Sequence, residues 1–176
     1  MIAAQGGRLT LPGLELVYLW NGFSIMGLDY TRVERYYVII EQEMEAVKQR
    51  RVNKSEKYEL EDDCLLLLLR GMCLKYMSAP LAAEECFRSV LEKTTKTQLQ
   101  ADKYILPYAT VELALILMET SPTSSSEEAW NLLETAKNYK DYSLQSRLHF
   151  RIHAAQNKLK SGDEGNNNNF IKVLFL

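Results

Sequence analysis

The chain contains little of what breaks helices or encloses a metal ion. It has only four prolines and eight glycines among 176 residues, which suits a mostly helical protein. Its three cysteines, Cys64, Cys73 and Cys86, include no Cys-x2-Cys pair, and no histidine lies at zinc-finger spacing. The cysteine pattern therefore does not predict a structural zinc site, and it favours a reducing compartment.

Long apolar runs and an excess of one charge are also missing. The longest runs, residues 14–28 and 65–69, are shorter than the ~20 residues that cross a bilayer. The N-terminus lacks the basic start and apolar core of a signal peptide. A formal net charge of −2 and a pI of about 5.8 give no field that attracts nucleic acid or an anionic membrane. We expect a cytoplasmic protein, with the nucleus and the membrane periphery as alternatives.

A repeat pattern runs through residues 64–91. Five positions recur at the spacing of the tetratricopeptide repeat, a pair of antiparallel helices: Leu67, Gly71, Leu74, Ala83 and Phe87. Two such helices need small residues where their backbones approach most closely, and Gly71 and Ala83 supply them. Phe87 is expected to fill the space between this pair of helices and the next pair.

A second, less regular unit follows at residues 107–140. Ala114 takes the place of the small residue in the first helix, and Ala129 and Leu133 resemble the second helix. The step from Ala114 to Ala129 is three residues longer than consensus, and the segment rich in serine and threonine between them can absorb this excess at little cost. A third, earlier unit is weaker, because Glu34 stands where its alanine belongs.

These patterns predict an all-α fold of tetratricopeptide-like helical hairpins stacked as a short α-solenoid, because one hairpin cannot bury its apolar surface alone. The expected helices span residues 14–27, 31–50, 60–77, 80–93, 104–119, 126–139 and 144–160. The expected regions are an N-terminal tail, a helical-repeat domain and a disordered asparagine-rich tail: residues 1–10, 11–160 and 161–176. Within the domain we expect a clear repeat, a degenerate repeat and a capping helix: residues 64–97, 107–140 and 144–160.

The first helix of each repeat lines the concave side of such a solenoid, which defines a candidate partner groove. Counting from the two small residues places these side chains there: Leu65, Leu68, Met72, Lys75, Tyr76, Tyr108, Val111, Leu115 and Met118, with Glu119 at the end. The lining is mainly apolar. Leu68 and Met72 stand where repeats that capture acidic C-terminal tails present Lys and Asn. The groove therefore fits an amphipathic helix or an extended segment of a protein partner.

Two alternatives for the groove stay open at this point. The N-terminal helices can fold into it, so that it becomes part of the core. It can also hold a lipid or another apolar small molecule, to which the flexible Met72 and Met118 would adapt. A lipid carrier needs a closed cavity with apolar walls, whereas a peptide groove stays open along one side.

Motifs for catalysis and for metal binding are not found. The sequence has no nucleophile elbow, phosphate-binding glycine loop or dinucleotide fingerprint, so we expect no enzymatic activity and no cofactor. His149 and His153 share a helical face, but Phe150 replaces the glutamate of His-Glu-x2-His and no third ligand is evident. A basic cluster at residues 48–57 is explained by a helix C-terminus and a solvated loop, so we expect no nucleic-acid partner.

Four segments carry a resemblance to a known family. They are residues 11–22 (LPGLELVYLWNG), 63–87, 109–119 and 138–155. The last, NYKDYSLQSRLHFRIHAA, is the most distinctive, because general repeat packing does not require it. On these segments the chain resembles the C-terminal part of the tetratricopeptide repeat protein 39 family.

The resemblance implies an intracellular, non-enzymatic helical-repeat protein of a family associated with lipid homeostasis, whose members are much longer than this chain. Together with the groove, it predicts a scaffold for protein–protein interaction. The alternative function is a binder or carrier of a lipid or another apolar small molecule.

Overall fold

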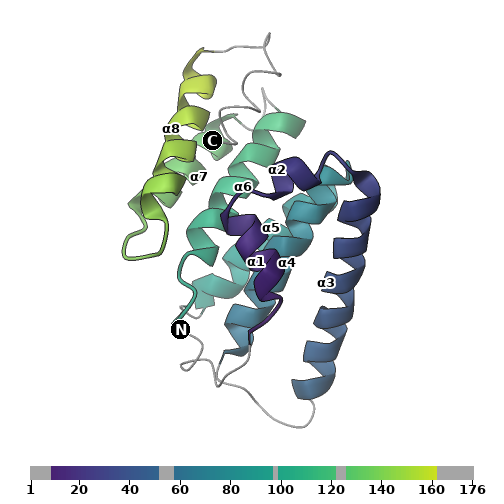
Figure 1. Ribbon diagram of the computed structural model, residues 1–176. Coiled ribbons are helices and arrows are strands. Elements are labelled where there is room, and N and C mark those ends of the chain that lie inside the picture. The colour runs from purple at the N-terminus through teal and green to yellow at the C-terminus, as the bar shows by residue number, and fades with distance from the viewer. Residues whose placement is uncertain (1–8, 52–57, 97–98, 122–125, 162–176) are drawn as a thin grey trace.

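The computed structural model describes residues 9–51, 58–96, 99–121 and 126–161 (Figure 1). Over these residues the chain forms eight helices and no strand. The helices are α1 (Pro12–Leu19), α2 (Phe23–Met26), α3 (Tyr30–Arg51), α4 (Glu59–Tyr76), α5 (Pro80–Lys96), α6 (Ile105–Thr120), α7 (Ser126–Asn138) and α8 (Gln145–Ser161). The predicted all-α class is confirmed. The predicted tails lie outside the described residues, except for residues 9, 10 and 161.

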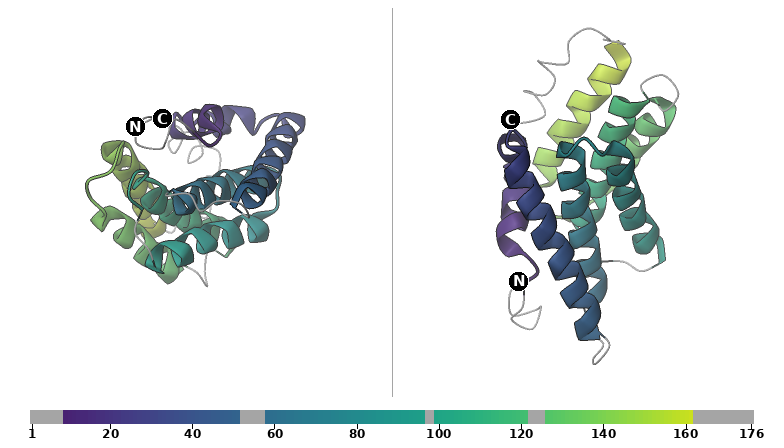
Figure 2. Two further views of the ribbon diagram at one scale, coloured as in Figure 1. Left: turned by 90° about the horizontal axis from the view of Figure 1, so that it is seen from below. Right: turned by 90° about the vertical axis from the view of Figure 1, so that its right-hand side faces the viewer.

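From α3 onward, consecutive helices pack side by side, as they do in an α-solenoid. Contacts link α3 to α4, α4 to α5, α5 to α6, α6 to α7 and α7 to α8, and α4 also contacts α6. Viewed from below, α1 and α2 lie across the side formed by α4 and α6, between α3 and α8 (Figure 2). The helices α5 and α7 lie on the other side. The predicted stacking of helical hairpins is confirmed.

Small residues allow the close packing within the hairpins. A Cβ atom added to Gly71 would lie 2.6 Å from Cε1 of Phe87, so α4 has no room for a side chain at this point. Ala83 and Phe87 are fully buried on α5, while Leu67 and Leu74 pack against or within the core. In the second hairpin Ala114, Ala129 and Leu133 are all fully buried. The repeat-defining residues thus lie inside the described structure.

The single helix predicted over residues 14–27 is wrong, because the chain forms α1 and α2 there. Asn21 adopts a left-handed backbone conformation with φ of 62°, which asparagine tolerates better than most residues. The N–H of Gly22 then donates to the carbonyl of Val17 at 2.7 Å, and a Cβ at Gly22 would lie 2.8 Å from Cγ1 of Val17. Only a glycine fits this tight turn, which lets both short helices follow the same side of the domain.

Candidate functional site

The predicted groove residues all lie on α4 and α6, two helices that contact each other. Seven of the nine have exposed fractions of at most 8%: Leu65, Leu68, Met72, Tyr108, Val111, Leu115 and Met118. Lys75 and Tyr76 are partly buried. The predicted groove residues therefore lie on one pair of contacting helices, and most of them are buried in this chain.

The N-terminal helices α1 and α2 provide the cover. Their buried side chains are Leu14, Tyr18 and Phe23. The Tyr18 ring meets the Tyr108 ring edge to face, with 5.9 Å between the ring centroids, and Phe23 stacks on Tyr76 at 6.3 Å. The N-terminal helices therefore pack against the predicted groove at Tyr108 and Tyr76.

Two hydrogen bonds connect α1 to other parts of the chain. The hydroxyl of Tyr104, just before α6, donates to Oε1 of Glu15 at 2.5 Å. Burial raises the pKa of Glu15, and the bond from Tyr104 opposes that shift. At the other end, Nη1 of Arg147 donates to the carbonyl of Leu19 at 2.9 Å. A cation at a helix C-terminus satisfies a free carbonyl and opposes the helix dipole.

A buried ionic cluster connects α1 with three other helices, α4, α6 and α8. Glu112 of α6, whose side chain is 1% exposed, accepts a hydrogen bond from Nη2 of Arg151 of α8 at 2.7 Å. The Tyr18 hydroxyl of α1 donates to the same carboxylate oxygen at 3.3 Å. Nζ of Lys75 of α4 lies 3.8 Å from the second oxygen and 3.4 Å from Glu119. The cluster therefore fixes how α1, α4, α6 and α8 lie relative to one another.

The protonation states in this cluster follow from burial and neighbouring charge. Burial opposes ionisation of Glu112, but Arg151 and Lys75 outweigh it and hold the pKa of Glu112 below its usual value. Burial, followed by the charge of Glu112, raises the pKa of Tyr18 well above its usual value, so Tyr18 stays protonated and donates. Within the described structure, Oε2 of Glu112 and Nε of Arg151 have no hydrogen-bond partner. The cluster is charged and only partly satisfied.

Sequence reasoning missed Glu112. It is the only charged residue between Ile105 and Met118 in a run that is otherwise almost entirely apolar, and that isolation is the signal that marks it. A carboxylate in such a run is buried with the helix, and a buried carboxylate needs a cation. Arg151, beside the apolar stripe of α8, is the cation that the fold supplies.

The outward side of the N-terminal helices is apolar as well. Five large side chains between residues 16 and 30 are exposed, and we call this set the outer face: Leu16 of α1, Trp20, Ile25 of α2, Leu28, and Tyr30 at the start of α3. Leu16 lies two residues from both buried anchors of α1, and Ile25 lies two residues from Phe23, which places each on the opposite side of its helix. Trp20 is 70% exposed and Leu28 is 86% exposed. Apolar side chains gathered in this way mark interaction surfaces more often than scattered ones do.

The described residues offer little for redox or metal chemistry. Over the described ranges no three His, Cys, Asp or Glu side chains are grouped so that they could hold a metal ion. His149 lies 3.5 Å from Gln145, and His153 lies 3.0 Å from Asn157. Burial raises the pKa of both Cys64 and Cys73 to about 12, which keeps these thiols protonated. In the same ranges, no helix has the length and apolar character needed to cross a membrane.

Comparison with known proteins points in the same direction as the fold. A family model described as Iml2/Tetratricopeptide repeat protein 39 matches residues 3–77, which include α1 to α4. The Tetratricopeptide repeat protein ttc-39B of Caenorhabditis elegans is 36% identical over 147 residues, which are 84% of this chain and 23% of that protein. The chain thus spans about a quarter of that relative's length. No solved structure matches the chain.

Proposed function

Because the chain belongs to the tetratricopeptide repeat protein 39 family, we propose that it is a non-enzymatic scaffold for protein–protein interaction. Its partner is a helical segment with an apolar side, and the partner binds the outer face. In this arrangement the groove residues of α4 and α6 pack against the buried side of the N-terminal helices. From the family resemblance we further propose that the scaffold acts in lipid homeostasis. The proposed location is the cytoplasm.

One observation carries this proposal: the N-terminal helices are apolar on both sides and buried on only one. A helix that is apolar all round is normally enclosed. The inner side of α1 and α2 is enclosed by the groove, through Leu14, Tyr18 and Phe23. The outer face, with Trp20 and Ile25, lacks a corresponding cover in the described structure. A partner helix would complete a three-layer packing of groove, N-terminal helices and partner.

A helical partner fits this surface better than an extended one. Leu16 of α1 and Trp20, the residue that caps the C-terminus of α1, are four residues apart, which is the spacing that packs against another helix. Helical-repeat proteins bury their apolar surfaces by stacking helices on neighbouring helices, so a helix laid on α1 continues the same packing. The lipid-carrier alternative is the weaker one, because α1 and α2 pack against the groove residues Tyr108 and Tyr76.

Site-specific photo-crosslinking in living cells tests the proposal. A photoreactive amino acid is placed at Trp20 or Ile25, and in matched controls at Leu81 of α5 or Phe150 of α8, which are exposed apolar positions elsewhere. We expect positions 20 and 25 to capture the same polypeptide, with the crosslinked peptide mapping to an amphipathic helix.

The control positions decide what a capture means. Equal capture of that polypeptide at positions 81 and 150 would contradict a defined docking surface. Adducts at positions 20 and 25 that consist of a second copy of the chain, or of lipid, would each contradict a separate protein partner.

A further inference from the structure

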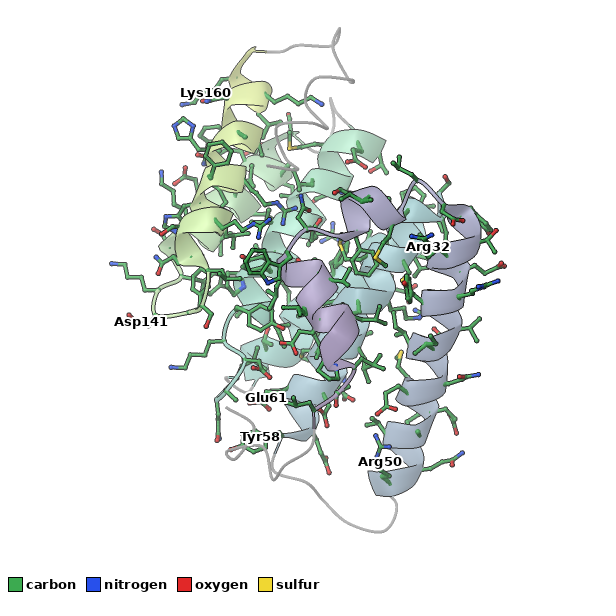
Figure 3. The ribbon with its side chains drawn as sticks, viewed as in Figure 1. Arg32, Arg50, Tyr58, Glu61, Asp141 and Lys160 are labelled. Atoms are coloured by element: carbon green, nitrogen blue, oxygen red, sulfur yellow. The ribbon has the colours of Figure 1, made fainter. Side chains whose placement is uncertain are left out.

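A second candidate binding site lies outside the groove, where the two hairpins meet the start of the last helix. An open cavity of about 270 Å³ is lined by the end of α5, the residues that lead into α6, the start of α6 and the segment between α7 and α8, the loop that carries Asp141 in Figure 3. Its walls consist of Thr94, Leu99, Lys103, Leu106, Tyr139, Lys140 and Tyr142. The proposed scaffold function makes no use of this cavity.

The charged side chains that line the cavity have one sign. Lys103 and Lys140 line it, and none of the seven lining residues is acidic. Neighbouring lysines are paired, since Lys93 lies 3.4 Å from Asp63 and Lys137 lies 3.9 Å from Glu134. Among the described residues neither lysine of the cavity has such a partner. The start of α6 adds the positive end of a helix dipole beside Lys103.

The remaining walls are aromatic and apolar. The rings of Tyr139 and Tyr142 and the side chains of Leu99 and Leu106 form surfaces against which a planar or apolar group can pack. The hydroxyl of Tyr142 is shielded from water and has no hydrogen-bond partner within the described ranges. Burial raises the pKa of Tyr142 to about 12, so this ring carries no negative charge at neutral pH that would repel an anion.

We propose that this cavity binds a phosphate monoester carried on a planar or apolar stem. The two lysine ammonium groups meet the phosphate, which carries close to two negative charges at neutral pH. The stem packs against the tyrosine rings and the leucine side chains that line the cavity. The cavity is slightly smaller than the ~300–1,000 Å³ typical of ligand pockets, which restricts the ligand to a small group.

Titration of the whole chain with phenyl phosphate, followed by amide and tyrosine-ring NMR shifts, tests the site. Three further probes separate the parts of the ligand: inorganic phosphate has the anion alone, phenol has the stem alone, and benzoate has the stem with a single charge. We expect saturable shifts at the lining residues, and binding of phenyl phosphate at least roughly tenfold tighter than of any other probe.

A matched pair of variants distinguishes the cavity from general surface charge. Lys103→Gln with Lys140→Gln removes both charges of the cavity and should weaken phenyl phosphate binding by at least roughly tenfold. Lys48→Gln with Lys137→Gln removes the same total charge from exposed lysines outside the cavity and should leave binding unchanged. Equal losses in both variants, shifts spread over the whole surface, or no saturable shift would each overturn the proposal.

Discussion

Helices α1 and α6 are both rich in apolar residues, but they differ in how much of their surface is buried. Their charged residues are few: Glu15 in α1, and Glu112 and Glu119 in α6. Thirteen of the 16 residues of α6 are buried, because α4, α5, α7 and α8 surround it. Only Leu14 and Tyr18 are buried among the eight residues of α1. Among the described residues, α6 is packed against other helices on all sides, whereas α1 is packed on one side only.

The largest expected effect concerns the ionic cluster that connects the two helices. Arg151→Met leaves Glu112 charged and buried with weaker compensation, so we expect a loss of about 3–5 kcal/mol in the free energy of unfolding. Urea unfolding followed by circular dichroism measures it. The double variant Arg151→Met, Glu112→Gln removes both charges and should recover most of that loss. A double variant as unstable as the single one would show that the charge pairing is not what Arg151 contributes.

The next effect separates the two sides of the N-terminal helices. Phe23→Ala removes a fully buried ring and is expected to lower the free energy of unfolding by about 3 kcal/mol. Ile25→Ala, two residues away and 73% exposed, should change it by no more than about 0.5 kcal/mol. Similar losses from both variants in thermal or urea unfolding would mean that both sides are enclosed within the chain itself.

A smaller effect is expected at the centre of the first hairpin. Gly71→Ala forces a methyl group against the Phe87 ring, and overpacking of this kind lowers the free energy of unfolding by about 1–3 kcal/mol. Exposed glycines in helices usually gain stability from the same substitution, since alanine has the better helix propensity. A stabilised Gly71→Ala variant would therefore show that α4 and α5 do not approach closely at this residue.

The smallest effect concerns the pH dependence of the ionic cluster. The pKa of Glu112 is lower in the folded chain than its usual value of 4.5, so its ionisation stabilises the fold above about pH 4.5. That contribution is lost as the pH falls from about 4.5 through the folded-state pKa. Urea midpoints of the chain and of Glu112→Gln should converge over this range. A constant difference between the two midpoints down to acidic pH would contradict the lowered pKa.

The sequence predicted the two hairpins well because their signals are local. Gly71, Ala83 and Phe87 lie close enough in sequence for helix spacing alone to bring them together. The groove residues of α4 and α6 were predicted from the same spacing, and the structure has most of them buried.

The position of the N-terminal helices could not be predicted in the same way. Their position depends on contacts such as the hydrogen bond from Tyr18 to Glu112, two residues that are 94 positions apart in the sequence. The spacing of apolar residues along a helix does not predict such a long-range pair. The break at Asn21 depends on a single left-handed residue inside a run that otherwise fits one helix. The outer face escaped prediction because α1 has apolar residues on every side, so the pattern does not say which side is enclosed.

The most direct test of the central claim is the affinity of the helical partner, captured by crosslinking at position 20, for two surface variants. Trp20→Glu changes the outer face, and Leu81→Glu makes the same kind of change at an exposed position on α5. We expect Trp20→Glu to weaken binding at least roughly tenfold, because large aromatic side chains dominate such interfaces, and Leu81→Glu to leave it unchanged. Equal affinities for both variants would contradict the claim that the exposed side of α1 and α2 is where a partner binds.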